Sequence, residues 1–131
     1  MIIVVDPVFN PNKTGNVSVT GTCGRDNSLP QKNPTTDAKK SCKFNYGDEV
    51  LVPTLTYVAS FQAIKAAGLI PVACDINKEN LLLDTSILEE KINSKTKAIM
   101  PVHYSGDPSN ISKVYEIASK YNLRVIEDAA H

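Results

Sequence analysis

After Tyr46 the sequence alternates short apolar runs with segments of helical periodicity. The apolar runs have the length and composition of strands buried on both faces of a sheet: Glu49–Val52, Ile70–Cys74, Ala98–Val102 and Arg124–Glu127. Strands that alternate with helices are joined by right-handed crossovers and form a mainly parallel sheet. The sequence therefore predicts an α/β fold with helices flanking this sheet.

Two of the helical patterns are well defined. The first is predicted from Tyr57 to Ala67, and Gly68 fits the left-handed position that ends many helices. The clearest pattern runs from Ser109 to Tyr121. Its apolar residues recur at the spacing of one helical face, namely Ile111, Val114, Tyr115 and Ala118, whereas Lys113, Glu116 and Lys120 face water.

A weaker helix is predicted to begin near Asp84 or Ser86. The segment from Ser86 to Glu89 matches a capping box, in which a serine hydroxyl and a glutamate carboxylate bind backbone amides of the first turn. This assignment turns three apolar side chains inward: Ile87, Leu88 and Ile92.

The first 46 residues have a different character. Ile2 to Val5 can form a strand, but Asn10 to Lys43 is rich in small polar residues and proline and has no regular apolar period. Such a stretch buries little apolar surface, so we expect loop or disorder there. The predicted organisation is an irregular or rearranged segment, 1–46, followed by an α/β unit, 47–131.

Charge and cysteine usage narrow the functional classes. The 14 basic and 14 acidic side chains of the 131 residues balance, which argues against nucleic-acid and anionic-membrane partners. The opening residues, Met1 to Val5, lack the pattern of a secretory leader, so we expect a cytoplasmic location. Three widely spaced cysteines and two histidines indicate neither a disulfide framework nor a metal site, and Cys74 is expected in the core.

Polar and aromatic residues follow three of the predicted strands. Pro53 to Tyr57 comes after the first, His103 to Gly106 after the third, and Asp128 to His131 after the fourth. Ligands of parallel α/β proteins bind beyond the carboxyl ends of the strands. The sequence therefore predicts a site at this edge.

Each candidate residue also has a structural interpretation. Asp128 can be a helix N-cap or part of a structural ion pair, and Tyr57 can be a core aromatic. His103 can hydrogen-bond to nearby backbone, and His131 can simply be exposed. No G-x-G-x-x-G follows a strand and no Walker A loop is present, although a small flavodoxin-like or nucleotide-binding domain remains an open alternative.

The sequence from Gly47 to His131 resembles the DegT family of sugar aminotransferases. The resemblance is carried by five blocks in order: Gly47–Ser60, Ala67–Val72 leading to Asp75, Thr96–His103, Gly106 with Pro108, and Val125–His131. It implies a fold type I cofactor domain that uses pyridoxal phosphate. It also implies transfer of an amino group, usually from glutamate, to a nucleotide-linked keto-sugar in amino-sugar or polysaccharide biosynthesis. Enzymes of this family are typically homodimers.

The resemblance assigns three cofactor-binding residues. Asp128 matches the aspartate that pairs with the pyridine nitrogen, where its charge keeps the ring protonated and electron-withdrawing. Tyr57 matches the aromatic residue that stacks on the ring, and His131 occupies a position near the phenolic oxygen that usually holds glutamine or histidine.

The sequence also departs from the family pattern. The Schiff-base lysine of the family follows the segment matched by Val125–His131, and neither Lys65 nor Lys97 matches it, so no catalytic residue is assigned. We expect a truncated member without turnover, with an unpaired sheet edge and marginal stability. The alternative is a non-catalytic remnant or a binding subunit that needs a second chain.

Overall fold

The computed structural model describes residues 2–5 and 44–130. It contains a sheet of five strands, β1 (Ile2–Val5), β2 (Glu49–Pro53), β3 (Ile70–Cys74), β4 (Thr96–Ile99) and β5 (Arg124–Asp128). Two α-helices accompany it, α2 (Val58–Ala66) and α3 (Ile111–Tyr121), with two short 3₁₀ helices, η1 (Leu88–Lys91) and η2 (Tyr104–Gly106). The irregular stretch predicted between Asn10 and Lys43 lies outside the described residues.

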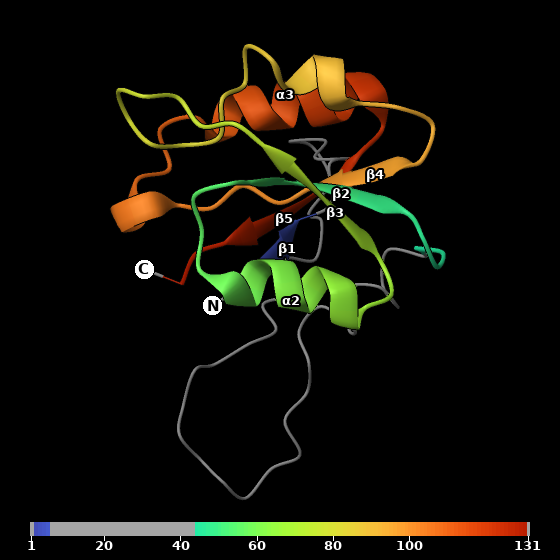
Figure 1. Ribbon diagram of the computed structural model, residues 1–131. Coiled ribbons are helices and arrows are strands. Elements are labelled where there is room, and N and C mark those ends of the chain that lie inside the picture. Colours follow the sequence, from blue (N-terminus) through green and yellow to red (C-terminus); the bar gives the residue numbers. More distant parts are fainter. Residues whose placement is uncertain (1, 6–43, 131) are drawn as a thin grey trace, which may run out of the picture.

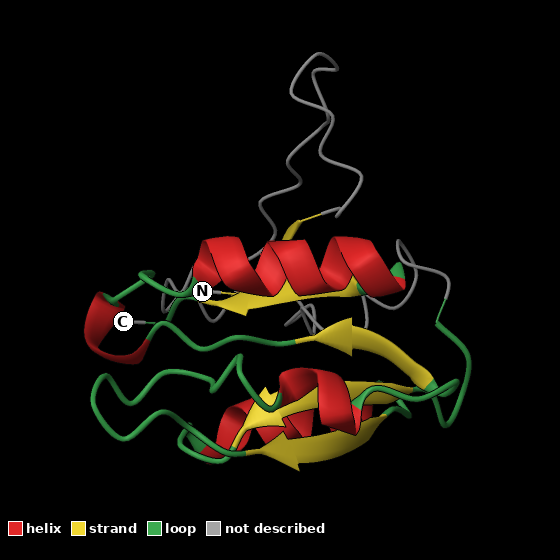
Figure 2. Ribbon diagram, turned by 90° about the horizontal axis from the view of Figure 1, so that it is seen from above, coloured by secondary structure: helices red, strands yellow, loops and turns green. Residues whose placement is uncertain are grey.

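The sheet is mainly parallel, as predicted. Its strand order is β1-β5-β4-β2-β3, and β2, β3, β4 and β5 run parallel to their neighbours, whereas β1 pairs antiparallel with β5. The helices α2 and α3 cover opposite faces of this sheet (Figure 1). In the second view α3 runs along the strands beneath it (Figure 2), and it contacts β4 and β5. The α/β fold class is therefore confirmed.

Each face of the sheet has its own apolar core. The core on the α3 face includes Leu51, Ile99 and Val125, and the core on the α2 face includes Val50 and Ile126. Successive residues of a strand point to opposite faces. This alternation continues to the end of β5, so the last two side chains of that strand, at positions 127 and 128, leave the sheet on opposite sides.

Both predicted α-helices are confirmed: α2 is one residue shorter at each end than expected, and α3 begins two residues later and ends at the expected residue. Gly68 has a φ of +72°, so it occupies the left-handed position predicted for it after α2. The helix α3 ends in the same way at Asn122, which has a φ of +53°. Asparagine is one of the few residues that tolerate this conformation.

The predicted strand Ala98–Val102 is displaced toward its start, because its pairing with β2 ends at Pro101, whereas its pairing with β5 continues. The amide of Met100 still donates to the carbonyl of Leu51 in β2. Pro101 has no amide proton for a further bond of this kind, while its carbonyl accepts from the amide of Asp128 in the other neighbour, β5. Val102 then forms an isolated parallel bridge with Asp128.

The predicted second helix is wrong in kind, since only the single 3₁₀ turn η1 forms. The capping box is absent because the hydroxyl of Ser86 donates to Oδ1 of Asp84, 2.6 Å away, and no side chain caps η1. Leu88 is fully buried as expected, but Ile87 and Ile92 are only partly buried.

The prediction that all strands are buried on both faces is wrong for β3. This strand lies at the edge of the sheet, and 47% of Ile70 is exposed. Cys74 at the other end of β3 is 1% exposed, which confirms its place in the core. Burial raises the pKa of the Cys74 thiol, so this group is held in its unreactive protonated form.

The edge of β5 is paired rather than open. Ile2 to Val5 lie opposite Asp128 to Val125 in antiparallel register, so β1 covers the edge that was expected to be unpaired. Deleting residues 1–5 should uncover this backbone and promote self-association through strand pairing. Sedimentation velocity at increasing concentration measures this effect, with the full chain as control. An unchanged monomer fraction in the deletion variant would contradict it.

Candidate active site

Asp128 lies at the carboxyl end of β5 and is held on the α2 face of the sheet. Only 7% of the residue is exposed, and its Oδ2 atom accepts a hydrogen bond of 2.6 Å from the hydroxyl of Ser60 in the first turn of α2. The Ser60 oxygen is 2.7 Å from the hydroxyl of Thr56. Because the single proton of Ser60 goes to Asp128, Thr56 is the donor of this second bond.

The two hydrogen bonds that link Thr56, Ser60 and Asp128 leave free acceptor positions on the Asp128 carboxylate. An ionised carboxylate offers about four lone-pair positions, and the hydroxyl of Ser60 uses one of them. Asp128 is therefore a buried, oriented carboxylate at the predicted edge.

Tyr57 stands at the same edge and on the same face. It is the N-cap residue of α2, one turn before Ser60, and its carbonyl accepts from the Ser60 amide at 3.1 Å. Since 76% of Tyr57 is exposed, the interpretation as a core aromatic is wrong. An exposed aromatic ring at the same edge as a buried carboxylate can cover a flat ligand.

His103 is held by a carboxylate, which corrects the expectation of a backbone partner for its imidazole. Its Nε2 atom is 2.7 Å from Oε2 of Glu127, and the residue is 7% exposed. The hydroxyl of Tyr115 in α3 donates to the other oxygen of Glu127. The turn that follows His103 is sharp, because Ser105 and Gly106 have φ angles of +53° and +79°.

Three residues around the site were not singled out from the sequence as site residues. Ser60 appeared only at the end of a matched block, Tyr115 was assigned to the apolar face of α3, and Glu127 to the end of a strand. One available signal was the alternation along β5, which separates residues 127 and 128 onto opposite faces.

The remaining candidates do not join this group in the described structure. His131 lies outside the described residues. Lys65 is in the last turn of α2, and Lys97 is near the start of β4 with its Nζ atom 2.8 Å from the carbonyl of Ser94. Because strands and helix run in opposite directions, both lysines lie toward the amino edge, away from Asp128.

Other features of the described residues lie elsewhere or carry no ligand signature. A surface groove of about 700 Å³ beyond β3 is lined by residues 75–79, Asp84 and Ile87, and by none of the site candidates. Among residues 2–5 and 44–130, no three histidine, cysteine or acidic side chains gather as metal ligands. Neither described α-helix has the length and apolarity to cross a bilayer.

The sequence matches the model of the DegT/DnrJ/EryC1/StrS aminotransferase family over residues 38–131. The chain belongs to this family. The match begins nine residues before Gly47, the first residue of the resemblance described above. It includes β2 to β5 and both α-helices.

Individual members of the DegT/DnrJ/EryC1/StrS family are similar to this chain over part of their length. GDP-perosamine synthase of Escherichia coli O157:H7 is 50% identical over 84 residues, which cover 64% of this chain and 23% of that protein. The chain therefore spans about a quarter of the length of this relative.

Solved structures of aminotransferases share the fold. DesV of S. venezuelae, in complex with a ketimine intermediate, superposes with a TM-score of 0.70 and 35% identity over 73% of this chain and 26% of its own. NtdA of Bacillus subtilis, with bound cofactor PMP, superposes with a TM-score of 0.70 and 36% identity, over 74% of this chain and 22% of its own. These neighbours are fold type I aminotransferases, so the predicted fold type is confirmed.

The aminotransferases of the DegT/DnrJ/EryC1/StrS family depend on pyridoxal phosphate. The residues of this chain fit such a cofactor in two respects. Asp128 offers a buried carboxylate with acceptor positions to spare, and Tyr57 offers an exposed ring at the same edge.

Proposed function

We propose that this chain carries the pyridine-binding part of an aminotransferase site. In this role Asp128 pairs with the ring nitrogen of pyridoxal phosphate and Tyr57 covers the ring. His131 is proposed to lie near the phenolic oxygen. When bound, the cofactor supplies an electron-withdrawing ring that stabilises negative charge at the amino-bearing carbon of the substrate.

The observation that carries this proposal is the hydrogen bond from Ser60 to Asp128. A carboxylate that is 93% buried costs free energy unless donors satisfy it, and one hydroxyl satisfies only part of it. A protonated pyridine nitrogen supplies both a donor and a positive charge. The Ser60 bond also fixes the carboxylate in angle, which a charge-assisted hydrogen bond requires.

We further propose that the substrate class is a nucleotide-linked keto-sugar and that glutamate is the amino donor. The support is the 50% identity to GDP-perosamine synthase within a family of sugar aminotransferases. As in relatives of this family, the working assembly would be a homodimer. Residues 47–131 form the proposed cofactor unit, and residues 1–46 form an N-terminal segment whose strand β1 joins the sheet of that unit.

Covalent attachment of the cofactor requires a lysine amine, and we propose that no lysine of this chain provides it. Lys65 and Lys97 lie toward the edge opposite Asp128. Turnover would then require a lysine from outside these 131 residues, and these residues alone would be inactive.

Borohydride reduction tests this proposal. After incubation with pyridoxal phosphate and reduction, peptide mass spectrometry should find no lysine modified in preference to the others. The expected yield at each lysine is the low, uniform one of exposed amines, and a denatured sample is the control. One lysine labelled to completion, together with amino-donor turnover, would contradict the proposed inactivity of the chain.

A further inference from the structure

A second polar cluster lies at the end of β5, on the α3 face of the sheet. We call it the edge triad; it consists of His103, Glu127 and Tyr115. The imidazole Nε2 of His103 is 2.7 Å from Oε2 of Glu127, and the two side chains are 9% and 16% exposed. The Tyr115 hydroxyl donates to Oε1 of Glu127. The triad joins the loop after β4, the strand β5 and the helix α3.

The hydrogen bonds of the edge triad satisfy the carboxylate of Glu127. A carboxylate with so little exposure needs donors on both oxygens, and the imidazole and the phenol supply one each. Burial and the hydrogen bond to Glu127 raise the pKa of Tyr115, so its hydroxyl keeps the proton that it donates. Glu127 is thus fixed from two separate elements.

The backbone links this cluster to Asp128. The amide of His103 donates to the carbonyl of Asp128 at 3.0 Å, and the amide of Asp128 donates to the carbonyl of Pro101 at 2.9 Å. His103 therefore binds Glu127 through its imidazole and Asp128 through its backbone amide. On the opposite face, Ser60 holds the side chain of Asp128.

We propose that the edge triad is a positioning device for Asp128. By fixing Glu127 on the α3 face, it sets the direction in which the Asp128 carboxylate leaves the strand on the α2 face. This inference rests on the proposed function, because only a cofactor contact demands that orientation. Charge-assisted hydrogen bonds to a ring nitrogen depend on alignment, and misplacement of a site group by about 1 Å weakens such sites strongly.

The alternative is a purely structural triad that stabilises the whole domain. The two roles differ in which amide protons exchange faster when the triad is broken. A structural role lowers protection throughout the sheet, since global unfolding then dominates exchange. A positioning role opens the end of β5 alone.

The test is amide hydrogen exchange by NMR on the full chain without cofactor, comparing Glu127→Leu, Glu127→Gln and wild type. Glu127→Leu should speed exchange at Asp128 and His103 by about tenfold or more, the factor expected for losing hydrogen bonds to a charged group. Amides in β2 and β3 should keep their rates. Glu127→Gln retains an acceptor oxygen and should recover most of the protection.

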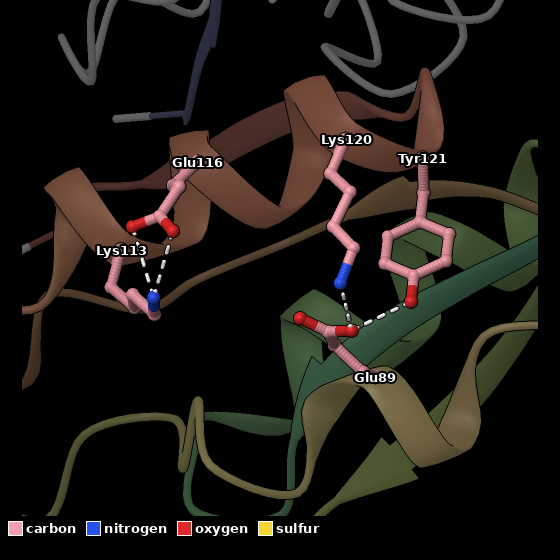
Figure 3. A network of polar contacts seen from close by, with 5 residues as sticks. All are labelled: Glu89, Lys113, Glu116, Lys120 and Tyr121. Carbon is pink, nitrogen blue, oxygen red and sulfur yellow. Dashed lines mark hydrogen bonds and ion pairs between the residues drawn. The ribbon is translucent and has the colours of Figure 1, made fainter.

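The carboxyl ¹³C resonance of Asp128 is the second measurement. It should move in Glu127→Leu and return toward the wild-type position in Glu127→Gln. Glu116→Leu is the matched control, because Glu116 lies on the exposed side of α3. Among the described residues it pairs only with Lys113. Figure 3 shows this pair apart from the contacts of Glu89 with Lys120 and Tyr121.

Two outcomes would overturn the proposal. One is an unchanged Asp128 amide and carboxyl resonance in folded Glu127→Leu, and the other is a uniform loss of protection across the sheet. Should Glu127→Leu fail to fold, Tyr115→Phe removes one hydroxyl with little change in volume and is judged by the same two measurements. Because no cofactor is present, these results stand apart from any failure of the proposed cofactor binding.

Discussion

Replacing Ile99 with alanine should destabilise the domain by about 3 kcal/mol, within the range measured for large-to-small changes in protein cores. Ile99 is fully buried in β4, the middle strand of the sheet, and packs in the core beneath α3. Its truncation removes apolar contacts and leaves a cavity that the neighbouring strands cannot fill without moving. Small domains have only about 5 to 15 kcal/mol of stability in total, so a large part of it is lost.

Ile70→Ala is the matched control, because it makes the same change in the edge strand β3. With 47% of Ile70 exposed, the loss should stay near 1 kcal/mol or below. Urea denaturation followed by circular dichroism measures both variants, and the midpoints should separate while the slopes stay equal. Equal midpoints would contradict the described exposure of β3 and the central position of β4.

The features predicted correctly from the sequence are those that depend on local pattern. The apolar period of α3 and the glycine after α2 are properties of neighbouring residues, and both appear in the structure as expected. Strand-end logic also located Asp128 and Tyr57 at one edge, since it follows from parallel topology alone.

The features that were missed depend on distant partners. The end of β4 is set by the loss of its pairing with β2 at Pro101. The capping box fails because the carboxylate of Asp84 competes for the hydroxyl of Ser86. The pairing of β1 with β5 is equally non-local. In the site, Ser60 and Glu127 were overlooked because their roles depend on which face of the sheet each neighbour occupies.

Asp128→Asn should weaken the binding of pyridoxamine phosphate roughly tenfold to a hundredfold, the loss expected when a hydrogen bond to a charged partner is removed. Asparagine has nearly the same size, and its carbonyl oxygen can still accept the hydrogen bond from Ser60. The fold should therefore change little in stability. The amine form of the cofactor is the suitable probe, because it binds without a lysine.

Asp84→Asn is the control that isolates the effect of position. Asp84 also accepts a serine hydroxyl at 2.6 Å, from Ser86, but it does so in a loop beyond β3, far along the sheet from β5. This hydrogen bond lowers the pKa of the Asp84 carboxyl, so Asp84 is ionised at neutral pH and the substitution removes its negative charge. Fluorescence titration with pyridoxamine phosphate should give wild-type affinity for this variant.

The comparison separates three accounts of the buried carboxylate. If Asp128 serves the pyridine nitrogen, affinity falls in Asp128→Asn, stays unchanged in Asp84→Asn, and the urea midpoints of both variants remain near that of wild type. If Asp128 only anchors α2 through Ser60, its substitution changes at most the midpoint. Equal affinity in all three proteins would assign the carboxylate to the fold, and absence of saturable binding in the folded wild-type chain would contradict the proposed pyridine contact.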